Sequence, residues 1–132
     1  MADTLQFDLV SPEKKLASVE ATMVELPGME GDMAAMPNHA PLLTTLRPGV
    51  IKVHATDGVT EYVVTGGFAE VSDAGTSVLA EQAMARDDVT RDGLDALIAE
   101  ATTSLESAED MAATVLAQRV NDLNTLASDL GL

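Results

Sequence analysis

The chain has 132 residues, a length that suits one domain or one domain with a small appendage. Its seven lysines and arginines are outnumbered by twenty-two aspartates and glutamates, which gives a formal net charge of −15. Such a surface repels phosphate, so nucleic acid and anionic lipid headgroups are poor partners for it. Because there is no cysteine, disulfides, thiolate metal sites and thiol nucleophiles are excluded.

The N-terminus lacks a basic start followed by a long apolar run, so we expect no signal peptide. No apolar run approaches the ~18 residues that a membrane-spanning helix needs, so direct insertion into a membrane is not expected. With only Phe7, Tyr62 and Phe68 as aromatics, the chain has no stacking platform for bases. A partner should therefore be neutral, basic or bound through a locally apolar patch.

Up to about Ala85, apolar and polar residues alternate with a period of two between turn signals such as Asp57-Gly58 and Gly66-Gly67. Short strands at this spacing are typical of a β-sandwich or a flattened barrel. The candidate strands are Leu5–Leu9, Val19–Met23, Val50–Ala55, Val59–Thr65, Phe68–Val71 and Ser77–Glu81.

The segment 30–49 interrupts this alternation. Four of the five prolines of the chain lie in or next to it, at Pro27, Pro37, Pro41 and Pro48. They are flanked by Gly28, Gly31 and Gly49. Because proline fixes φ and glycine permits positive φ, we expect one irregular, rigid backbone path. It carries Asp32 and His39, which have no catalytic partner nearby in sequence, so a docking surface is favoured over an active site. Residues alone leave open whether Met29, Met33 and Met36 fill a core or form a contact surface.

From Asp87 onward the pattern changes to that of amphipathic helices. Apolar residues recur at steps of three and four from Leu94 to Leu105 and again from Ala113 to Leu130. Thr90 is a candidate N-cap. The weakest helical stretch, Thr102–Ser107, contains neither glycine nor proline, so a single long helix remains an alternative. We favour an antiparallel α-helical hairpin because it buries both apolar stripes.

No group of residues has the spacing of a catalytic or metal site. His39 and His54 lie fifteen positions apart without clustered ligands, and we expect His54 to be exposed. Gly66-Gly67 is followed by no lysine and no helix, so a turn is favoured over a phosphate cradle. The acidic pairs Asp87-Asp88 and Glu109-Asp110 fit helix caps. We therefore expect no catalytic residue, no cofactor and no metal.

Five motifs make the chain similar to a known family over residues 5 to about 86. They are Val10-Ser11-Pro12-Glu13, Pro27-Gly28 with Glu30-Gly31-Asp32, Pro37 to Thr44, Arg47-Pro48-Gly49-Val50, and Gly66 to Val71. In order and spacing they resemble the epsilon subunit of bacterial rotary ATP synthases, the counterpart of the mitochondrial delta subunit. Asn38 stands where the family more often has glycine, and Asp32 where it usually has glutamate.

The resemblance implies a β-sandwich over residues 1–86 and a helical hairpin over residues 87–132. It implies a non-catalytic rotor subunit that passes rotation of the c ring to the gamma stalk, at the cytoplasmic face of the bacterial inner membrane. On this basis Glu30, Gly31, Asp32, His39 and Leu42 are expected to contact the c ring, and Ser11 and Thr44 to lie nearer gamma. The resemblance also favours partial exposure of the three methionines at the ring.

In parts of this family the hairpin contacts the alpha and beta catalytic subunits through basic side chains and inhibits hydrolysis, and some members bind ATP through a Leu/Ile-Asp-x-x-Arg-Ala motif. The matching segment here is Leu94 to Ala99, with Ile98 at the arginine position. From Leu94 to the C-terminus, Arg119 is the one cation among seven acids. We therefore expect poor inhibition and weak or absent ATP binding.

Two other functions remain as alternatives. An acidic adaptor that captures a basic partner would lose binding in salt. A small-ligand-binding sandwich would need a convergent polar cluster, which the sequence does not show.

Overall fold

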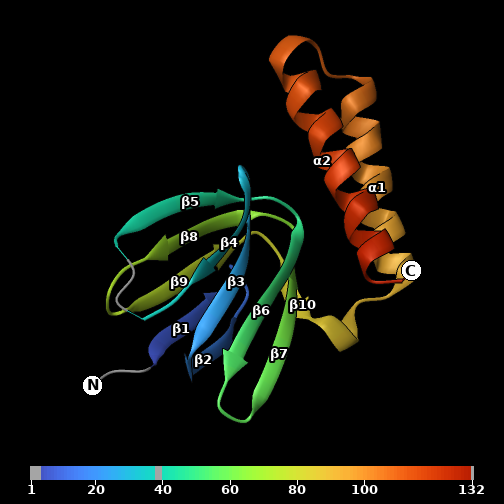
Figure 1. The fold of residues 1–132 in the computed structure, drawn as a ribbon. Coiled ribbons are helices and arrows are strands. Elements are labelled where there is room, and N and C mark those ends of the chain that lie inside the picture. Colours follow the sequence, from blue (N-terminus) through green and yellow to red (C-terminus); the bar gives the residue numbers. More distant parts are fainter. Residues whose placement is uncertain (1–3, 38–39, 132) are drawn as a thin grey trace. The chain divides into compact units, whose positions relative to one another are not determined.

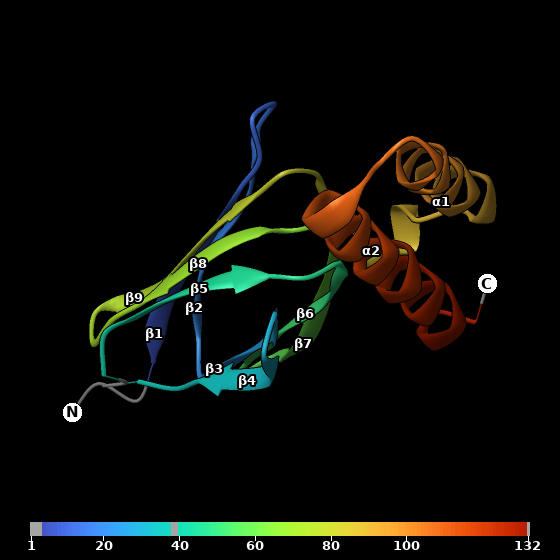
Figure 2. The same ribbon diagram turned by 90° about the horizontal axis from the view of Figure 1, so that it is seen from above.

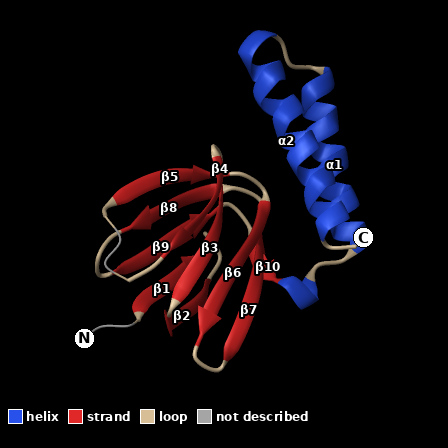
Figure 3. Ribbon diagram, viewed as in Figure 1, coloured by secondary structure: helices blue, strands red, loops and turns tan. Residues whose placement is uncertain are grey.

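A computed structural model describes residues 4–37 and 40–131. Residue contacts divide the chain into two compact units, Met1–Arg86 and Asp87–Leu132. The first holds strands and the second holds helices (Figures 1 and 3). The strands are β1 Leu5–Val10, β2 Lys15–Ala21, β3 Met23–Gly28, β4 Gly31–Ala35, β5 Leu42–Leu46, β6 Gly49–Ala55, β7 Gly58–Val64, β8 Gly67–Val71, β9 Gly75–Ala80 and β10 Ala83–Ala85. A 3₁₀ turn, Arg86–Asp88, precedes the helices α1 Arg91–Glu106 and α2 Asp110–Asp129.

The strands form one sheet in the order β10-β7-β6-β3-β5-β8-β9-β1-β2, and β4 adds to β3 outside this path. Neighbours pair antiparallel, apart from β1 and β9, which run parallel. Figure 2 shows β1, β9, β8 and β5 in one layer and β3, β6 and β7 in the other. The contact of β2 with β6 brings the two layers together at one edge. The expected sandwich or flattened barrel followed by a helical hairpin is confirmed.

The core of this unit is mainly aliphatic, because the chain has only three aromatic residues. Alternating inward residues of the strands are buried, and Phe7, Leu9, Leu26 and Ile51 are among the largest of them. The rings of Phe7 and Tyr62 lie 6.5 Å apart between centroids. The Asp57-Gly58 hairpin is confirmed by the pairing of Ala55 with Gly58, whose φ is 141°.

The expectation of an irregular path through residues 30–49 is wrong in part, because two strands lie in it. Gly31–Ala35 pairs with β3, and Leu42–Leu46 pairs with β8. Their backbone groups are hydrogen-bonded to the neighbouring strands. Pairing within the sheet therefore gives these residues a strand conformation that their local sequence does not predict. The single strand expected at Val19–Met23 is also wrong: it is divided at Thr22, where β2 ends and β3 begins.

The second unit is a helical hairpin, and the alternative of one long helix is wrong. The break falls at residues 107–109 and so begins at the last residue of the stretch of weakest propensity. Thr90 caps α1 as expected, because its side chain accepts a hydrogen bond from Gly93 N. Glu109 occupies the N-cap position of α2 but makes no side-chain capping bond, so its expected capping role is wrong. Asp110, the next residue, has φ at 56°.

Candidate interaction surface

Two of the glycine-proline motifs, Pro27 to Asp32 and Arg47 to Val50, meet at one corner of the β-unit. Gly28, the last residue of β3, pairs with Gly31 on one side and with Leu46 on the other. The main-chain N–H of Arg47 donates to the Pro27 carbonyl at 3.0 Å. A Cβ on Gly49 would lie 2.6 Å from the Pro27 side chain, so only glycine permits this approach. These short contacts explain why proline and glycine gather here.

The β3–β4 turn projects from this corner. Met29 and Glu30 form its exposed tip, and Gly31 follows with φ at 140°. The exposed carboxylate of Asp32 pairs with the guanidinium of Arg47, which also donates to the Gly28 carbonyl. We call Met29, Glu30, Gly31 and Asp32 the turn surface. It presents one apolar and two acidic side chains.

The predicted ring-facing residues are only partly brought together. Glu30, Gly31 and Asp32 share the turn surface, whereas Leu42 begins β5 and lies four residues from Leu46, roughly 13 Å along the strand. Leu42 itself is exposed. His39 lies outside the described residues.

Met29, Met33 and Met36 do not share one role: the sequence left open whether they fill the core or form a contact surface, and the structure shows both. Met29 and Met36 are about half exposed, while Met33 is partly buried and packs against the core.

The two residues expected nearer gamma lie in different settings. Ser11 follows β1, and its hydroxyl donates to the Lys14 carbonyl. It lines a shallow hollow of about 300 Å³ between β1, β8 and β9. Thr44 pairs across the sheet with buried Ala69, so it faces the inner side of β5 rather than this hollow.

A row of exposed apolar side chains borders the hollow and was not singled out from the sequence. Phe68 pairs with Leu79, and Leu79 pairs with Val10 on the other side. Phe68 is 54% exposed and Leu79 60%, while Val10 is half-buried. We call Val10, Phe68 and Leu79 the apolar row. The sequence does contain a signal for this row. Strands β8 and β9 have apolar residues on both faces, which predicts that both faces of these strands are covered.

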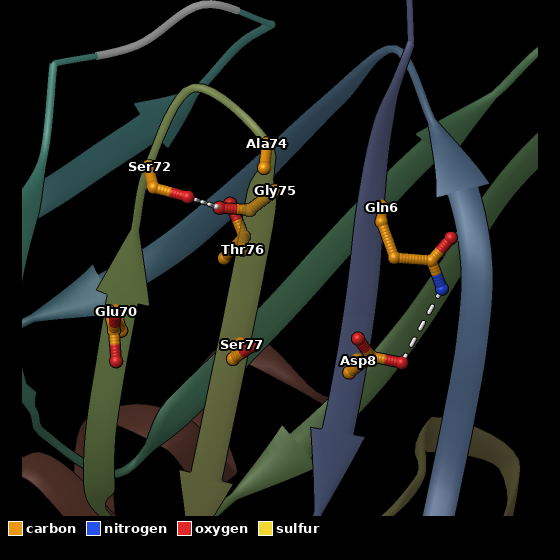
Figure 4. A pocket seen from close by; sticks show the side chains of 8 residues that line it. All are labelled: Gln6, Asp8, Glu70, Ser72, Ala74, Gly75, Thr76 and Ser77. Carbon is orange, nitrogen blue, oxygen red and sulfur yellow. Dashed lines mark hydrogen bonds between the residues drawn. The ribbon is translucent and has the colours of Figure 1, made fainter.

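Next to the apolar row, the same outer face becomes polar (Figure 4). A hollow of about 240 Å³ is lined by Gln6, Asp8, Glu70, Ser72, Ala74, Gly75, Thr76 and Ser77. The hydrogen bond from the Ser18 hydroxyl contributes most to lowering the pKa of Asp8; desolvation opposes it, and Gln6 and Lys15 add to the lowering. In the described part of the chain, no group of three or more histidines, cysteines or acids could hold a metal ion. The hollow therefore has the chemistry of a solvated sheet face.

His54 is not simply exposed, which corrects the expectation for it. It is half-buried on β6, and Nε2 lies 2.5 Å from the Glu25 carboxylate on β3. Its carbonyl accepts from the Thr22 hydroxyl at the break between β2 and β3. His54 therefore has a structural role across two strands.

The helical unit has a hollow of about 290 Å³ between α1 and α2. Ile98 lines it at the position where the nucleotide motif has arginine. Arg91 also lines it, and its Nε lies 3.8 Å from the carboxylate of Asp95 one turn later. The cation nearest this hollow is thus turned toward an acid of its own helix. Among the described residues, neither helix has the length and apolar character that crossing a membrane requires.

Comparison with known proteins gives consistent matches over most of the chain. The family model described as "ATP synthase, Delta/Epsilon chain, beta-sandwich domain" matches residues 4–86. A protein of Ruegeria sp. named ATP synthase epsilon chain is 61% identical over 110 residues, which cover 83% of this chain and 80% of that protein. A protein of the same name from Rhodobacter capsulatus is 48% identical over the full length of both chains.

Two solved structures share the fold. One is a chain of the Euglena gracilis mitochondrial ATP synthase, OSCP/F1/c-ring, with a TM-score of 0.76 and 20% identity, covering 98% of this chain and 83% of that chain. The other is a chain of the central stalk and c ring of the Tetrahymena thermophila mitochondrial ATP synthase, with a TM-score of 0.68 and 17% identity, covering 92% of this chain and 94% of that chain.

Proposed function

Since this chain belongs to the delta/epsilon family of ATP synthase subunits, we propose that it is a non-catalytic rotor subunit that couples the c ring to the gamma stalk. In this role it lies at the cytoplasmic face of the bacterial inner membrane as part of the synthase. Relatives named ATP synthase epsilon chain match this chain over 99–100% of both lengths, which supports this assignment.

The apolar row is the observation that carries the proposal. Large apolar side chains standing next to one another on three strands, with a hollow beside them, have the composition of an interface core rather than of a solvated face. We assign this surface, with Ser11 at its border, to gamma. A permanent rotor subunit needs such a contact, because obligate interfaces are larger and more hydrophobic than transient ones.

The turn surface is assigned to the c ring. Glu30 and Gly31 supply polar groups and Met29 supplies an adaptable apolar contact, while Asp32 pairs with Arg47 within the same surface. Exposed Leu42, at the other end of β5, is a separate candidate for this contact. Acidic side chains on an exposed turn suit polar or basic loops of a partner. His39 stays a candidate for this contact.

The helical hairpin is proposed to have little inhibitory action. Its cations are few, and Arg91 is engaged by Asp95. Contact with acidic segments of the alpha and beta subunits would therefore bring like charges together.

A purification experiment tests the gamma assignment. Membranes that carry tagged chain are solubilised, and the companions of the chain are identified at low and at moderate salt. We expect Phe68→Asp to abolish recovery of gamma, because it places a carboxylate in the apolar row. Val59→Asp is the matched control, since Val59 is 56% exposed on β7, outside that row.

Recovery of gamma with Phe68→Asp at the level of the control would refute the assignment of this surface. Loss of all companions at moderate salt would instead favour the acidic adaptor.

A further inference from the structure

Arg47 spans the β3–β4 turn with the two ends of its guanidinium. Nη1 donates to the carbonyl oxygen of Gly28 at 2.5 Å, and Nη2 pairs with the carboxylate of Asp32. Gly28 is the last residue of β3, and Asp32 is the second residue of β4. One side chain therefore holds both the entry and the exit of the turn.

The main chain of Arg47 is hydrogen-bonded within the corner, whereas the side chain of its acidic partner Asp32 is largely exposed. The main-chain N–H of Arg47 bonds to Pro27, and that of Met29 bonds to the Thr45 carbonyl at 2.9 Å. The side chain of Arg47 is 27% exposed, against 81% for Asp32. The guanidinium thus extends from a hydrogen-bonded corner to an exposed carboxylate.

The turn has little other support. In the described part of the chain, β4 pairs with β3 and with no further strand. A Cβ placed on Gly31 would have no atom within 4 Å, so nothing packs on that side. The direction in which Met29 and Glu30 point consequently depends on the β3 ladder, on the hydrogen bond from Met29 N to the Thr45 carbonyl, and on Arg47.

We propose that Arg47 is the positioning residue of the turn surface, and that Asp32 acts through Arg47 rather than by touching the ring. This rests on the proposed function, in which the turn surface docks on the c ring. Exposed ion pairs add little to global stability, but a guanidinium fork fixes geometry in a plane. The effect of Arg47 is therefore expected on local order and on coupling, while the β-unit stays folded.

Hydrogen exchange of the full chain measures the local effect. Arg47→Gln should speed exchange over residues 28–33 by about tenfold, the factor expected for losing one hydrogen bond to a charged group. Glu25→Gln is the matched control, because it removes the charge of another cross-strand pair on β3 and leaves the turn intact. The unfolding midpoint followed by Tyr62 should stay unchanged in both variants.

Equal exchange over residues 28–33 in Arg47→Gln and in the native chain would overturn the proposal. A large fall in the unfolding midpoint would also overturn it, since Arg47 would then support the whole β-unit.

Coupling is measured in inverted membrane vesicles that carry the complete synthase, as proton pumping per ATP hydrolysed. Arg47→Gln and Asp32→Asn should each lower this ratio, and the double variant should be no worse than the more severe single one. Arg47→Lys should restore part of the ratio, because an ammonium keeps the charge but not the fork. Additive losses would mean that Asp32 contacts the ring by itself, against the proposal.

Glu30→Arg separates this inference from the function on which it rests. Normal coupling with Glu30→Arg would refute the assignment of the turn surface to the c ring, whatever the result for Arg47→Gln. Impaired coupling with Glu30→Arg but normal coupling with Arg47→Gln leaves the ring contact standing and refutes the positioning role.

Discussion

Replacing Gly67 by alanine should destabilise the β-unit much more than replacing Gly58. The two glycines have nearly the same backbone, with φ at 139° and 141°. They differ in their surroundings: a Cβ on Gly67 would lie 2.1 Å from the Leu79 carbonyl oxygen and 2.8 Å from Ala80 Cα, whereas a Cβ on Gly58 meets nothing within 4 Å. The pair thus separates the cost of the dihedral angle from the cost of the clash.

The dihedral angle alone costs about 1–3 kcal/mol, since this region is nearly confined to glycine. Overpacking against backbone adds about 1–3 kcal/mol, because β9 has to move away from β8. We therefore expect Gly67→Ala to lose about 2 kcal/mol more than Gly58→Ala. For a unit of this size, that difference lowers the melting temperature by roughly 8–16 °C.

Urea unfolding followed by tyrosine fluorescence suits this comparison. Tyr62 is the single tyrosine, the chain has no tryptophan, and Tyr62 packs beside the core of the β-unit. Its signal therefore reports the strands and not the helices. Equal losses of unfolding free energy in the two variants would refute the reasoning from steric contact.

Three further predictions concern other parts of the molecule. Thr76→Val should raise the free energy of unfolding by about 1 kcal/mol in the same assay, because the buried Thr76 hydroxyl has no hydrogen-bond partner; a loss of stability would contradict this. Asp8 has a folded pKa below its unfolded value of 3.8, so its stabilisation is complete above pH 3.8 and is lost as the pH falls through the folded pKa. The difference in unfolding free energy between the native chain and Asp8→Asn should accordingly shrink below pH 3.8, and a constant difference would exclude this contribution. Calorimetric titration should detect no micromolar ATP binding, since Ile98 replaces the arginine of the motif and the carboxylate of Asp95 lies in the same hollow, where it repels phosphate; micromolar affinity would contradict that account.

The strands that sequence alone locates are those with strict alternation. Leu5–Leu9, for example, has one face in the core and one face toward solvent, and this half-buried setting produces the alternation of apolar and polar residues. Strand β4, by contrast, has the sequence GDMAA and carries no such pattern. Its conformation comes from pairing with β3, a tertiary effect that local preferences do not encode.

The candidate surfaces divide in the same way. The turn surface could be found because glycine and proline mark it along the chain. The apolar row could have been found from the two-sided apolar character of β8 and β9. The role of Arg47 could not, because its partners Gly28 and Asp32 lie far away in sequence and only the folded corner brings them within reach.

The parallel pairing of β1 with β9 has a consequence for synthesis of the chain. Phe7 lies opposite Thr76, so the first strand made receives its second neighbour only after almost the whole β-unit has left the ribosome. Contacts of such long sequence separation slow folding, and an uncovered strand edge invites association with other chains. Nascent chains halted before Gly75 should therefore expose β1 to chaperones, and release of the chaperone should coincide with emergence of β9.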